Sequence, residues 1–166
     1  VSGAEKLDDR VRQDFQVKFG KAVLEGYGTT ETSPVATCNL PDQLEPSRLK
    51  IQKGSQLGTV GMPLPGTSCI IVDPETLDEL PIGDAGMVLI GGPQVMQGYL
   101  GEPDKTKAVI KEIDGFRWYV TGDKGMIDED GFLTIIDRYS RFVKIRGEMI
   151  SLTAVERALR SVILEG

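Results

Sequence analysis

The sequence predicts an α+β fold in three parts: an α/β segment over residues 1–56, a small distorted β-barrel over residues 57–137, and a β-hairpin plus helix over residues 138–166. Three observations carry this prediction. Residues 1–25 follow a strand–helix–strand pattern, the helical period largely disappears between residues 58 and 137, and the chain holds 20 glycines and 9 prolines. Short apolar runs separated by glycine and proline turns are typical of barrels and folded-over sheets.

A helix is expected near the N-terminus because apolar residues recur there at every fourth position. Asp8 and Asp9 fall in its first turn, where the positive end of the helix dipole favours carboxylates, and Gly20 is placed to end it. Residues 22–24 then predict a short buried strand, and the polar stretch over residues 38–57 predicts a long surface loop. The apolar helix positions are Leu7, Val11, Phe15 and Phe19.

The middle of the chain is expected to consist mostly of strands. One helix interrupts them over residues 104–113, because Pro103 precedes this segment and Gly115 follows it. The expected strands are residues 68–72, 87–90 and 132–136.

The C-terminal part predicts a hairpin over residues 142–150 that turns near Arg146 and Gly147. Residues 153–163 follow as a helix with one apolar face. Because buried Leu or Ile side chains contribute about 1.5–3 kcal/mol each, these apolar residues are expected to find cover. We expect the segment to pack back onto the barrel, to pair with a second copy, or to be mobile.

Charge and composition narrow the possible functions of this 166-residue chain. Nineteen Lys and Arg against 25 Asp and Glu give a net charge of −6, which argues against nonspecific nucleic-acid or anionic-membrane partners. The absence of histidine excludes Ser-His-Asp triads, His-ligated zinc and imidazole acid–base chemistry within these residues. No apolar run approaches the roughly 18 residues of a membrane span.

Two further features indicate context. Cys38 and Cys69 lack the spacing of a redox or metal motif, which fits a reduced, cytoplasmic compartment. The sequence begins with Val1 and stops at Gly166 inside a helical pattern, so we expect it to be a piece of a longer protein.

Residues 26–31 read Gly-Tyr-Gly-Thr-Thr-Glu after the first expected strands. The glycines allow a sharp turn close to a ligand, the aromatic ring can face a base, and the hydroxyls can reach a phosphate oxygen. Glu31 supplies a hard oxygen of the kind that Mg²⁺ uses together with substrate phosphates. The same residues would also suit a glycine-rich turn with a surface glutamate.

Residues 118–123 read Trp-Tyr-Val-Thr-Gly-Asp, and residues 137–138 read Asp-Arg at the end of a strand. A carboxylate at a tight glycine turn can accept both hydroxyls of a ribose, and it can equally form an Asx turn. Arg138 offers a planar fork of donors suited to ribose or phosphate oxygens. The basic residues that follow, Lys144 and Arg146, would also suit the solvated face of a hairpin.

In this order and at these separations, the motifs resemble those of the adenylate-forming superfamily: acyl-CoA synthetases, acyl-acyl carrier protein synthetases, luciferases and peptide-synthetase adenylation domains. Residues 26–31 resemble its adenine and Mg²⁺ motif, residues 119–123 its ribose motif, and residues 137–147 its crossover into a mobile C-terminal lid. Residues 86–99 are similar to its GELxIxG…GY segment, with Met87 in place of the usual glutamate. Residues 2–5 resemble the strand end beside the adenine. The resemblance covers essentially the whole chain.

The resemblance implies an identity for each part. Residues 1–56 would be the C-terminal part of an adenylate-binding α/β subdomain, residues 57–137 a barrel-like subdomain, and residues 138–166 the hinge and truncated start of the lid. Ser140 occupies the hinge position, where much of the superfamily has aspartate, and Gly147 would line the thiol approach. The implied nucleotide-binding residues are Gly3, Ala4, Gly26, Tyr27, Gly28, Thr30, Asp123 and Arg138.

Individual roles follow from the same resemblance. Tyr27 is implied to stack on adenine, Thr30 to contact the α-phosphate and Glu31 to bind Mg²⁺. Asp123 is implied to bind the ribose hydroxyls, and Arg138 the ribose or a phosphate.

At the level of the subfamily, residues 92–99, 137–142 and 147–152 are similar to the synthetase half of bacterial bifunctional acyl-acyl carrier protein synthetase/2-acylglycerophosphoethanolamine acyltransferases. The parent would then join a fatty acid to the phosphopantetheine thiol of acyl carrier protein or CoA, using Mg·ATP and passing through acyl-AMP. It would be cytoplasmic, with the bacterial inner membrane as a possible place of association.

Two cationic elements of the family's active site do not occur in this sequence: the phosphate loop with its lysine, and the lid lysine. Because stabilisation of the transferring phosphoryl group dominates such chemistry, the isolated piece is expected to be inactive. Two alternatives stay open. One is another adenylate-forming enzyme, an acyl-CoA synthetase or a peptide-synthetase adenylation domain, and the other is a non-catalytic β-rich binding module.

Overall fold

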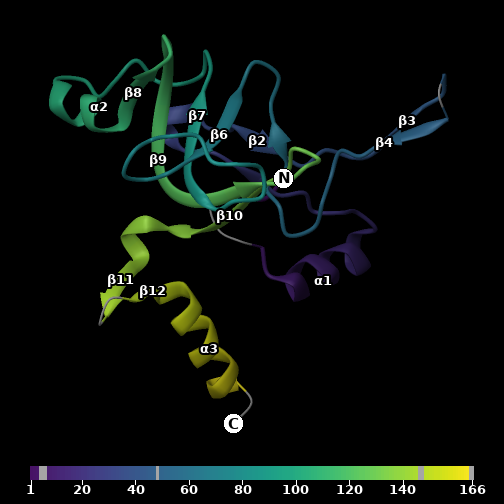
Figure 1. The fold of residues 1–166 in the computed structure, drawn as a ribbon. Coiled ribbons are helices and arrows are strands. Elements are labelled where there is room, and N and C mark those ends of the chain that lie inside the picture. The colour runs from purple at the N-terminus through teal and green to yellow at the C-terminus, as the bar shows by residue number, and fades with distance from the viewer. Residues whose placement is uncertain (4–6, 48, 146–147, 165–166) are drawn as a thin grey trace.

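The centre of the molecule is a curled five-stranded antiparallel sheet, seen in a computed structural model that describes residues 1–3, 7–47, 49–145 and 148–164 (Figure 1). Its strands run in the order β10-β9-β7-β6, and β8 pairs with the other end of β9. The predicted α+β class with a distorted barrel is therefore confirmed. The strands are β6 (Ser68–Val72), β7 (Gly86–Gly91), β8 (Ile110–Ile113), β9 (Phe116–Ile127) and β10 (Leu133–Arg138).

The hydrophobic core lies against this sheet. Val88, Leu89 and Ile90 of β7 and Leu133 of β10 are completely buried, and Tyr119 of β9 is 6% exposed. The three strands expected from the sequence coincide with β6, β7 and β10, with ends that move by up to two residues. Within the described ranges, no helix is both long and apolar enough to cross a membrane.

A second, smaller sheet joins the N-terminal part to the barrel. It consists of β1 (Gly26–Tyr27), β2 (Thr37–Cys38) and β5 (Met62–Pro63). The strand expected over residues 22–24 is wrong by a few positions, because Ser2 forms a parallel bridge with Glu25 and the ladder continues into Gly26. The parallel bridge brings residues 2–3 alongside β1.

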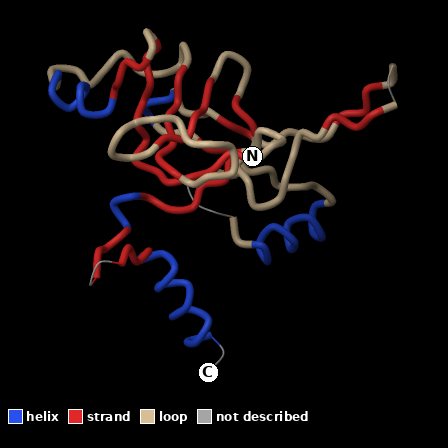
Figure 2. The backbone as a smooth tube through the Cα atoms, viewed as in Figure 1, coloured by secondary structure: helices blue, strands red, loops and turns tan. Residues whose placement is uncertain are grey.

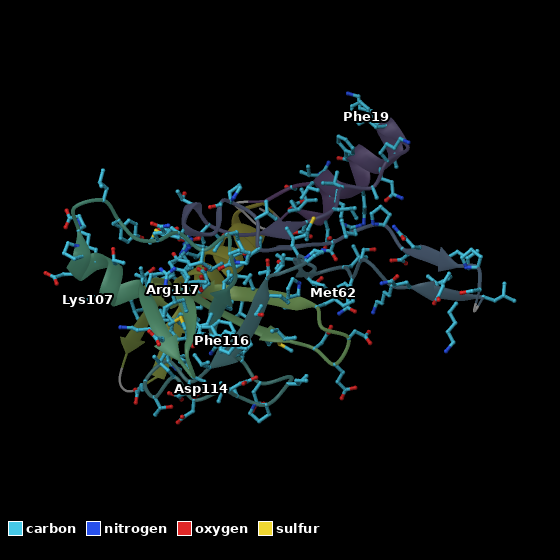
Figure 3. All side chains as sticks on the ribbon, turned by 90° about the horizontal axis from the view of Figure 1, so that it is seen from above. Phe19, Met62, Lys107, Asp114, Phe116 and Arg117 are labelled. Carbon is cyan, nitrogen blue, oxygen red and sulfur yellow. The ribbon has the colours of Figure 1, made fainter. Side chains whose placement is uncertain are left out.

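The first helix, α1 (Asp9–Phe19), is confirmed. The Asp8 carboxylate caps its N-terminus by accepting from the backbone N–H groups of Arg10 and Val11, and Gly20 ends it with a left-handed φ of 62°. Its apolar side chains are exposed: Val11 by 56% and Phe19 by 55%. Figure 3 shows Phe19 at the end of α1, far from the β8–β9 hairpin that carries Asp114 and Phe116.

The loop expected over residues 38–57 contains regular structure, so that expectation is wrong in part. β3 (Gln43–Glu45) and β4 (Lys50–Gln52) form an antiparallel hairpin that projects from the body of the molecule (Figures 1 and 2). Leu44 and Ile51 pair across it and are 62% and 70% exposed. The strands escaped prediction because each is three residues long and holds a single apolar residue, which is too short a run to reveal alternation.

The helix expected over residues 104–113 ends four residues too late. α2 (Pro103–Val109) ends where Ile110 takes an extended conformation, and β8 follows directly. Asp114 and Gly115 both have positive φ, 51° and 78°, as the two central residues of a tight hairpin turn require. This Asp-Gly turn pairs β8 with β9 and so ends the helix early.

The C-terminal hairpin and helix are also found. A 3₁₀ helix (Tyr139–Arg141) leads into β11 (Phe142–Ile145), β12 (Glu148–Ser151) and α3 (Leu152–Leu164). The expected turn at residues 146–147 lies outside the described residues. The described residues of α3 do not pack back onto the barrel: the helix points away from it (Figure 1), with Val155 42% and Leu159 56% exposed.

Asp137 anchors this C-terminal segment to the barrel. Its carboxylate, on a residue 9% exposed, accepts hydrogen bonds from the hydroxyls of Ser151 and Thr153 (3.1 Å) at the start of α3. The backbone N–H of Arg138 donates to the same carboxylate at 2.8 Å. Burial raises the pKa of Asp137, but these hydrogen bonds outweigh it and hold the pKa below its ordinary value.

We expect the attachment of α3 to weaken at acid pH. A carboxyl whose pKa is lowered by folding stabilises the folded state above its unfolded pKa of about 3.9, and this contribution is lost as pH falls through the lower folded pKa. The protection of α3 against hydrogen exchange, relative to intrinsic exchange at the same pH, should therefore fall below about pH 4. In Asp137→Ala, exchange should already be fast at pH 7, because two hydroxyls lose their acceptor at about 1–3 kcal/mol for a buried group. Equal protection in both proteins at pH 7 would contradict the anchor.

Candidate functional site

Asp123 is the centre of a polar cluster built from three strands. It is 3% exposed, and its Oδ2 accepts a hydrogen bond of 2.5 Å from the Tyr27 hydroxyl of β1. Its Oδ1 lies 3.3 Å from Nε of Arg138, which pairs with Asp123 across the β9–β10 ladder. Tyr27, Asp123 and Arg138, far apart in sequence, are thus brought together.

The two contacts on Asp123 differ in strength. Burial and the neighbouring Asp123 carboxylate both raise the pKa of Tyr27, so its phenol stays protonated and donates. The Arg138 side chain is 68% exposed, and an ion pair so open to solvent is weak. The carboxylate is therefore held firmly on one side, while its other oxygen faces an exposed cation.

A bulge in β9 places the Asp123 carboxylate. The β7–β9 register passes from Met87↔Lys124 to Leu89↔Val120, so β9 carries extra residues opposite Val88. Gly122 lies at this point with φ of 77°, a conformation that favours glycine. The Thr121 hydroxyl fixes the bulge, since it donates to the Val88 carbonyl at 2.9 Å and accepts from the Asp123 N–H at 3.0 Å.

These contacts bear on the two alternatives for Asp123. An Asx turn would direct its carboxylate to nearby backbone N–H groups, whereas here it meets side chains from two other strands. Tyr27 keeps a structural aspect, because its ring packs against the hydrophobic core.

The glycines predicted around Tyr27 lie where backbone segments approach each other. A Cβ at Gly28 would lie 2.0 Å from the Pro34 carbonyl oxygen, and one at Gly26 3.1 Å from that of Thr37. A Cβ on Gly3 would come within 3.3 Å of the Gly26 carbonyl oxygen. The close approach in this structure is thus to the chain itself.

Glu31 forms a second polar cluster. It lies in a 3₁₀ helix (Thr30–Thr32), which is closed by a 2.9 Å hydrogen bond from the Thr29 N–H to the Thr32 hydroxyl. Its Oε1 accepts a 2.6 Å hydrogen bond from the Tyr99 hydroxyl. That bond lowers the pKa of Glu31 and raises the pKa of Tyr99 to about 12, so the carboxylate is ionised at neutral pH and the phenol is not.

The donor set suits a magnesium ion bound together with a phosphate. Glu31 presents an ionised, half-buried carboxylate, and Mg²⁺ typically takes one or two protein carboxylates plus substrate phosphates. Among the described residues, no group of three or more His, Cys, Asp or Glu side chains could hold a metal without such a ligand.

Two of the remaining predicted residues are exposed to solvent, and two lie outside the described residues. Thr30 is exposed at the start of its 3₁₀ helix, and Ser140 is exposed in the one that precedes β11. Ala4 and Gly147 lie outside the described residues.

Sequence reasoning gave no role to Tyr99, Thr121 or Asp137, although each lies inside a motif that it quoted. Their partners, Glu31, Val88 and Ser151, are 68, 33 and 14 residues away along the chain. A hydroxyl next to a glycine is a local signal that could have marked Tyr99 and Thr121. The pairing itself required the fold.

Comparison with known proteins decides the family. The profile of the family described as AMP-binding enzyme matches residues 1–100. The chain belongs to this family. A long-chain-fatty-acid–CoA ligase from Yersinia pestis is 37% identical over 99% of the chain, and one from Bacillus subtilis is 36% identical over 96%. A 4-coumarate–CoA ligase from Petroselinum crispum is 36% identical over 96%.

Solved structures of this kind also match the fold. ATP-bound MatB from Rhodopseudomonas palustris superposes with a TM-score of 0.75 at 37% identity over 93% of the chain. O-succinylbenzoate coenzyme A synthetase from Bacillus subtilis gives 0.74 at 29% identity over 96%. The chain spans only 26–28% of the length of the three curated relatives, and 28% and 32% of these two solved chains.

Proposed function

We propose that this chain is part of an ATP-dependent ligase that converts a carboxylic acid to its acyl adenylate and then transfers the acyl group to a thiol. The observation that carries the proposal is the buried Asp123 carboxylate, held by Tyr27 on one oxygen and facing Arg138 with the other. Such a carboxylate suits a ribose diol, because it can accept hydrogen bonds from both hydroxyls at once.

We assign each of these residues a role in binding ATP. Asp123 binds the ribose hydroxyls, and the exposed Arg138 turns from Asp123 toward the ribose or a phosphate. Tyr27 orients Asp123 and faces the adenine, while Gly3, Ala4, Gly26 and Gly28 form the backbone wall beside it. Thr30 contacts the α-phosphate. Glu31 would hold Mg²⁺, which supplies charge neutralisation at the phosphates when bound.

The finer assignment rests on sequence resemblance. We propose a fatty acid as the acid and acyl carrier protein or CoA as the thiol, in a cytoplasmic protein whose parent could also carry the acyltransferase of the bifunctional enzymes. Residues 1–56, 57–137 and 138–166 would be the adenylate subdomain, the barrel and the start of the lid, with Ser140 at the hinge and Gly147 beside the thiol. Because these relatives are named as CoA ligases, they favour a ligase that uses CoA over an adenylation domain that activates an amino acid.

The test is pyrophosphate release by the full-length protein with ATP, Mg²⁺ and a series of carboxylic acids, followed by thioester formation with CoA or acyl carrier protein. We expect release that depends on the acid, and a thioester with one acceptor. The 166-residue chain alone should form no acyl-AMP. A full-length protein that binds neither AMP nor a nonhydrolysable acyl-AMP analogue by titration calorimetry would instead be a binding module.

A further inference from the structure

The Tyr99 hydroxyl donates a hydrogen bond to the Glu31 carboxylate, across 68 residues of sequence. We infer that Tyr99 is a positioning residue for Glu31: it fixes the carboxylate in the orientation that receives the magnesium ion of Mg·ATP. This inference rests on the proposed function and assigns a role to the Gly98–Tyr99 segment.

Glu31 is held at two points by the same loop. The Tyr99 hydroxyl binds Oε1 of Glu31 at 2.6 Å, and the backbone N–H of Met96 donates to the Glu31 carbonyl oxygen at 2.8 Å. Side chain and backbone of Glu31 are therefore both fixed by residues 96–99, which follow β7. A glutamate anchored at its backbone and at its carboxylate keeps few rotamers, and such preorganisation is what a metal ligand requires.

Tyr99 is in turn held by α2. Its backbone N–H donates to the Thr106 hydroxyl at 2.9 Å, and that hydroxyl donates to the Glu102 carbonyl at 3.0 Å. A Cβ on Gly98 would lie 2.8 Å from the Thr106 methyl carbon, so glycine is needed for the loop to approach the helix. An unbroken series of contacts thus runs from α2 through Tyr99 to Glu31.

The charge state of the pair agrees with this role. A neutral phenol that donates to a carboxylate leaves the second carboxylate oxygen for a cation. Glu31 is half-buried and so still partly open to solvent, which lets a cation reach it.

The variant Tyr99→Phe in the full-length protein tests the inference, because it removes the hydroxyl and keeps the ring. The readout is titration calorimetry of a nonhydrolysable ATP analogue with and without Mg²⁺, which needs no turnover. Loss of an outer-shell partner typically costs 10–100-fold in metal affinity, so we expect the enhancement of analogue binding by Mg²⁺ to fall by about tenfold or more. Binding without Mg²⁺ should stay unchanged.

Tyr139→Phe is the matched control, since Tyr139 packs its ring against Phe142 in the segment after β10 and should leave the Mg²⁺ effect intact. A double-mutant cycle separates positioning from a purely structural role. In a Glu31→Gln background, Tyr99→Phe should have no further effect on Mg²⁺ dependence, whereas a structural defect would persist there and lower the melting temperature.

The outcomes are distinguishable. If the unmodified protein does not bind the analogue at all, the proposed function fails and the inference with it. If it binds the analogue with a Mg²⁺ dependence that Tyr99→Phe leaves unchanged, the proposed function stands and the positioning role of Tyr99 is overturned.

Discussion

Replacing Asp123 by alanine is expected to weaken ATP binding by the full-length protein by about 1.5–3 kcal/mol, the value of hydrogen bonds to a charged group. That corresponds to roughly a 10- to 150-fold rise in Kd. The variant removes the proposed acceptor of the ribose hydroxyls. It also leaves the Tyr27 hydroxyl without the partner that it has at 2.5 Å. Calorimetric titration with ATP in the absence of the acid substrate measures the change.

Two further variants assign the loss to the carboxylate. Asp123→Asn keeps an oxygen for Tyr27 but loses the charge, so ATP binding should weaken while the melting temperature stays close to that of the unmodified protein. Asp130→Ala removes an exposed carboxylate that pairs with Lys53, and it should change neither. If Asp123→Ala binds ATP normally, Asp123 serves only to join β1 to the barrel.

The sequence predicted the parts of the fold that depend on local patterns. Helix α1 followed from the spacing of its apolar residues, the aspartates at its start and Gly20, although Asp8 proved to be its N-cap and not part of its first turn. The strands β6 and β7 followed from apolar runs between turns. Tyr27, Glu31, Asp123 and Arg138 were singled out because motifs at the right separations supported one another. The structure brings Tyr27, Asp123 and Arg138 together.

The errors have physical causes that a local reading cannot see. The β3 and β4 strands are three residues long with one apolar residue each, so their period-two alternation is too short to be recognised. The end of α2 depends on the pairing of β8 with β9, a competition between helix and ladder that the Asp-Gly turn decides. The apolar face of α1 is exposed, which shows that apolar periodicity predicts a helix but does not predict whether another element packs against its apolar face.

Replacing Gly61 by alanine is expected to be far more destabilising than the same change at Gly58, three residues away. Both glycines have left-handed φ, +87° and +82°, so each alanine pays about 1–2 kcal/mol for that conformation. At Gly58 a Cβ would meet nothing within 4 Å. At Gly61 it would lie 1.9 Å from the Cys38 carbonyl carbon, which is main chain and cannot turn aside.

The position of Gly61 makes this clash costly for the whole site. Its carbonyl accepts from the Leu133 N–H at 2.9 Å, and the Val60 N–H donates to the Leu133 carbonyl at 2.8 Å. Residues 60–61 therefore connect β10 of the barrel to β2, which pairs with the β1 strand that carries Tyr27. Relief of the clash would move β2 away from this connection and pull Tyr27 from Asp123. We expect Gly61→Ala to destabilise the folded state by more than about 4 kcal/mol. A loss of this size is exceptional for a single substitution and is typical of steric overpacking.

The difference in unfolding free energy between the two variants is measured by denaturant unfolding of the full-length protein. The unfolding is followed with a spectroscopic probe located in this part of the chain. Gly58→Ala should lose about 1–2 kcal/mol and keep its ATP affinity, while Gly61→Ala should be strongly destabilised or fail to accumulate in soluble form. The two effects separate because only one of the alanines meets a backbone. Equal destabilisation by the two substitutions would show that strain at positive φ, rather than the close approach to β2, explains why glycine occupies position 61.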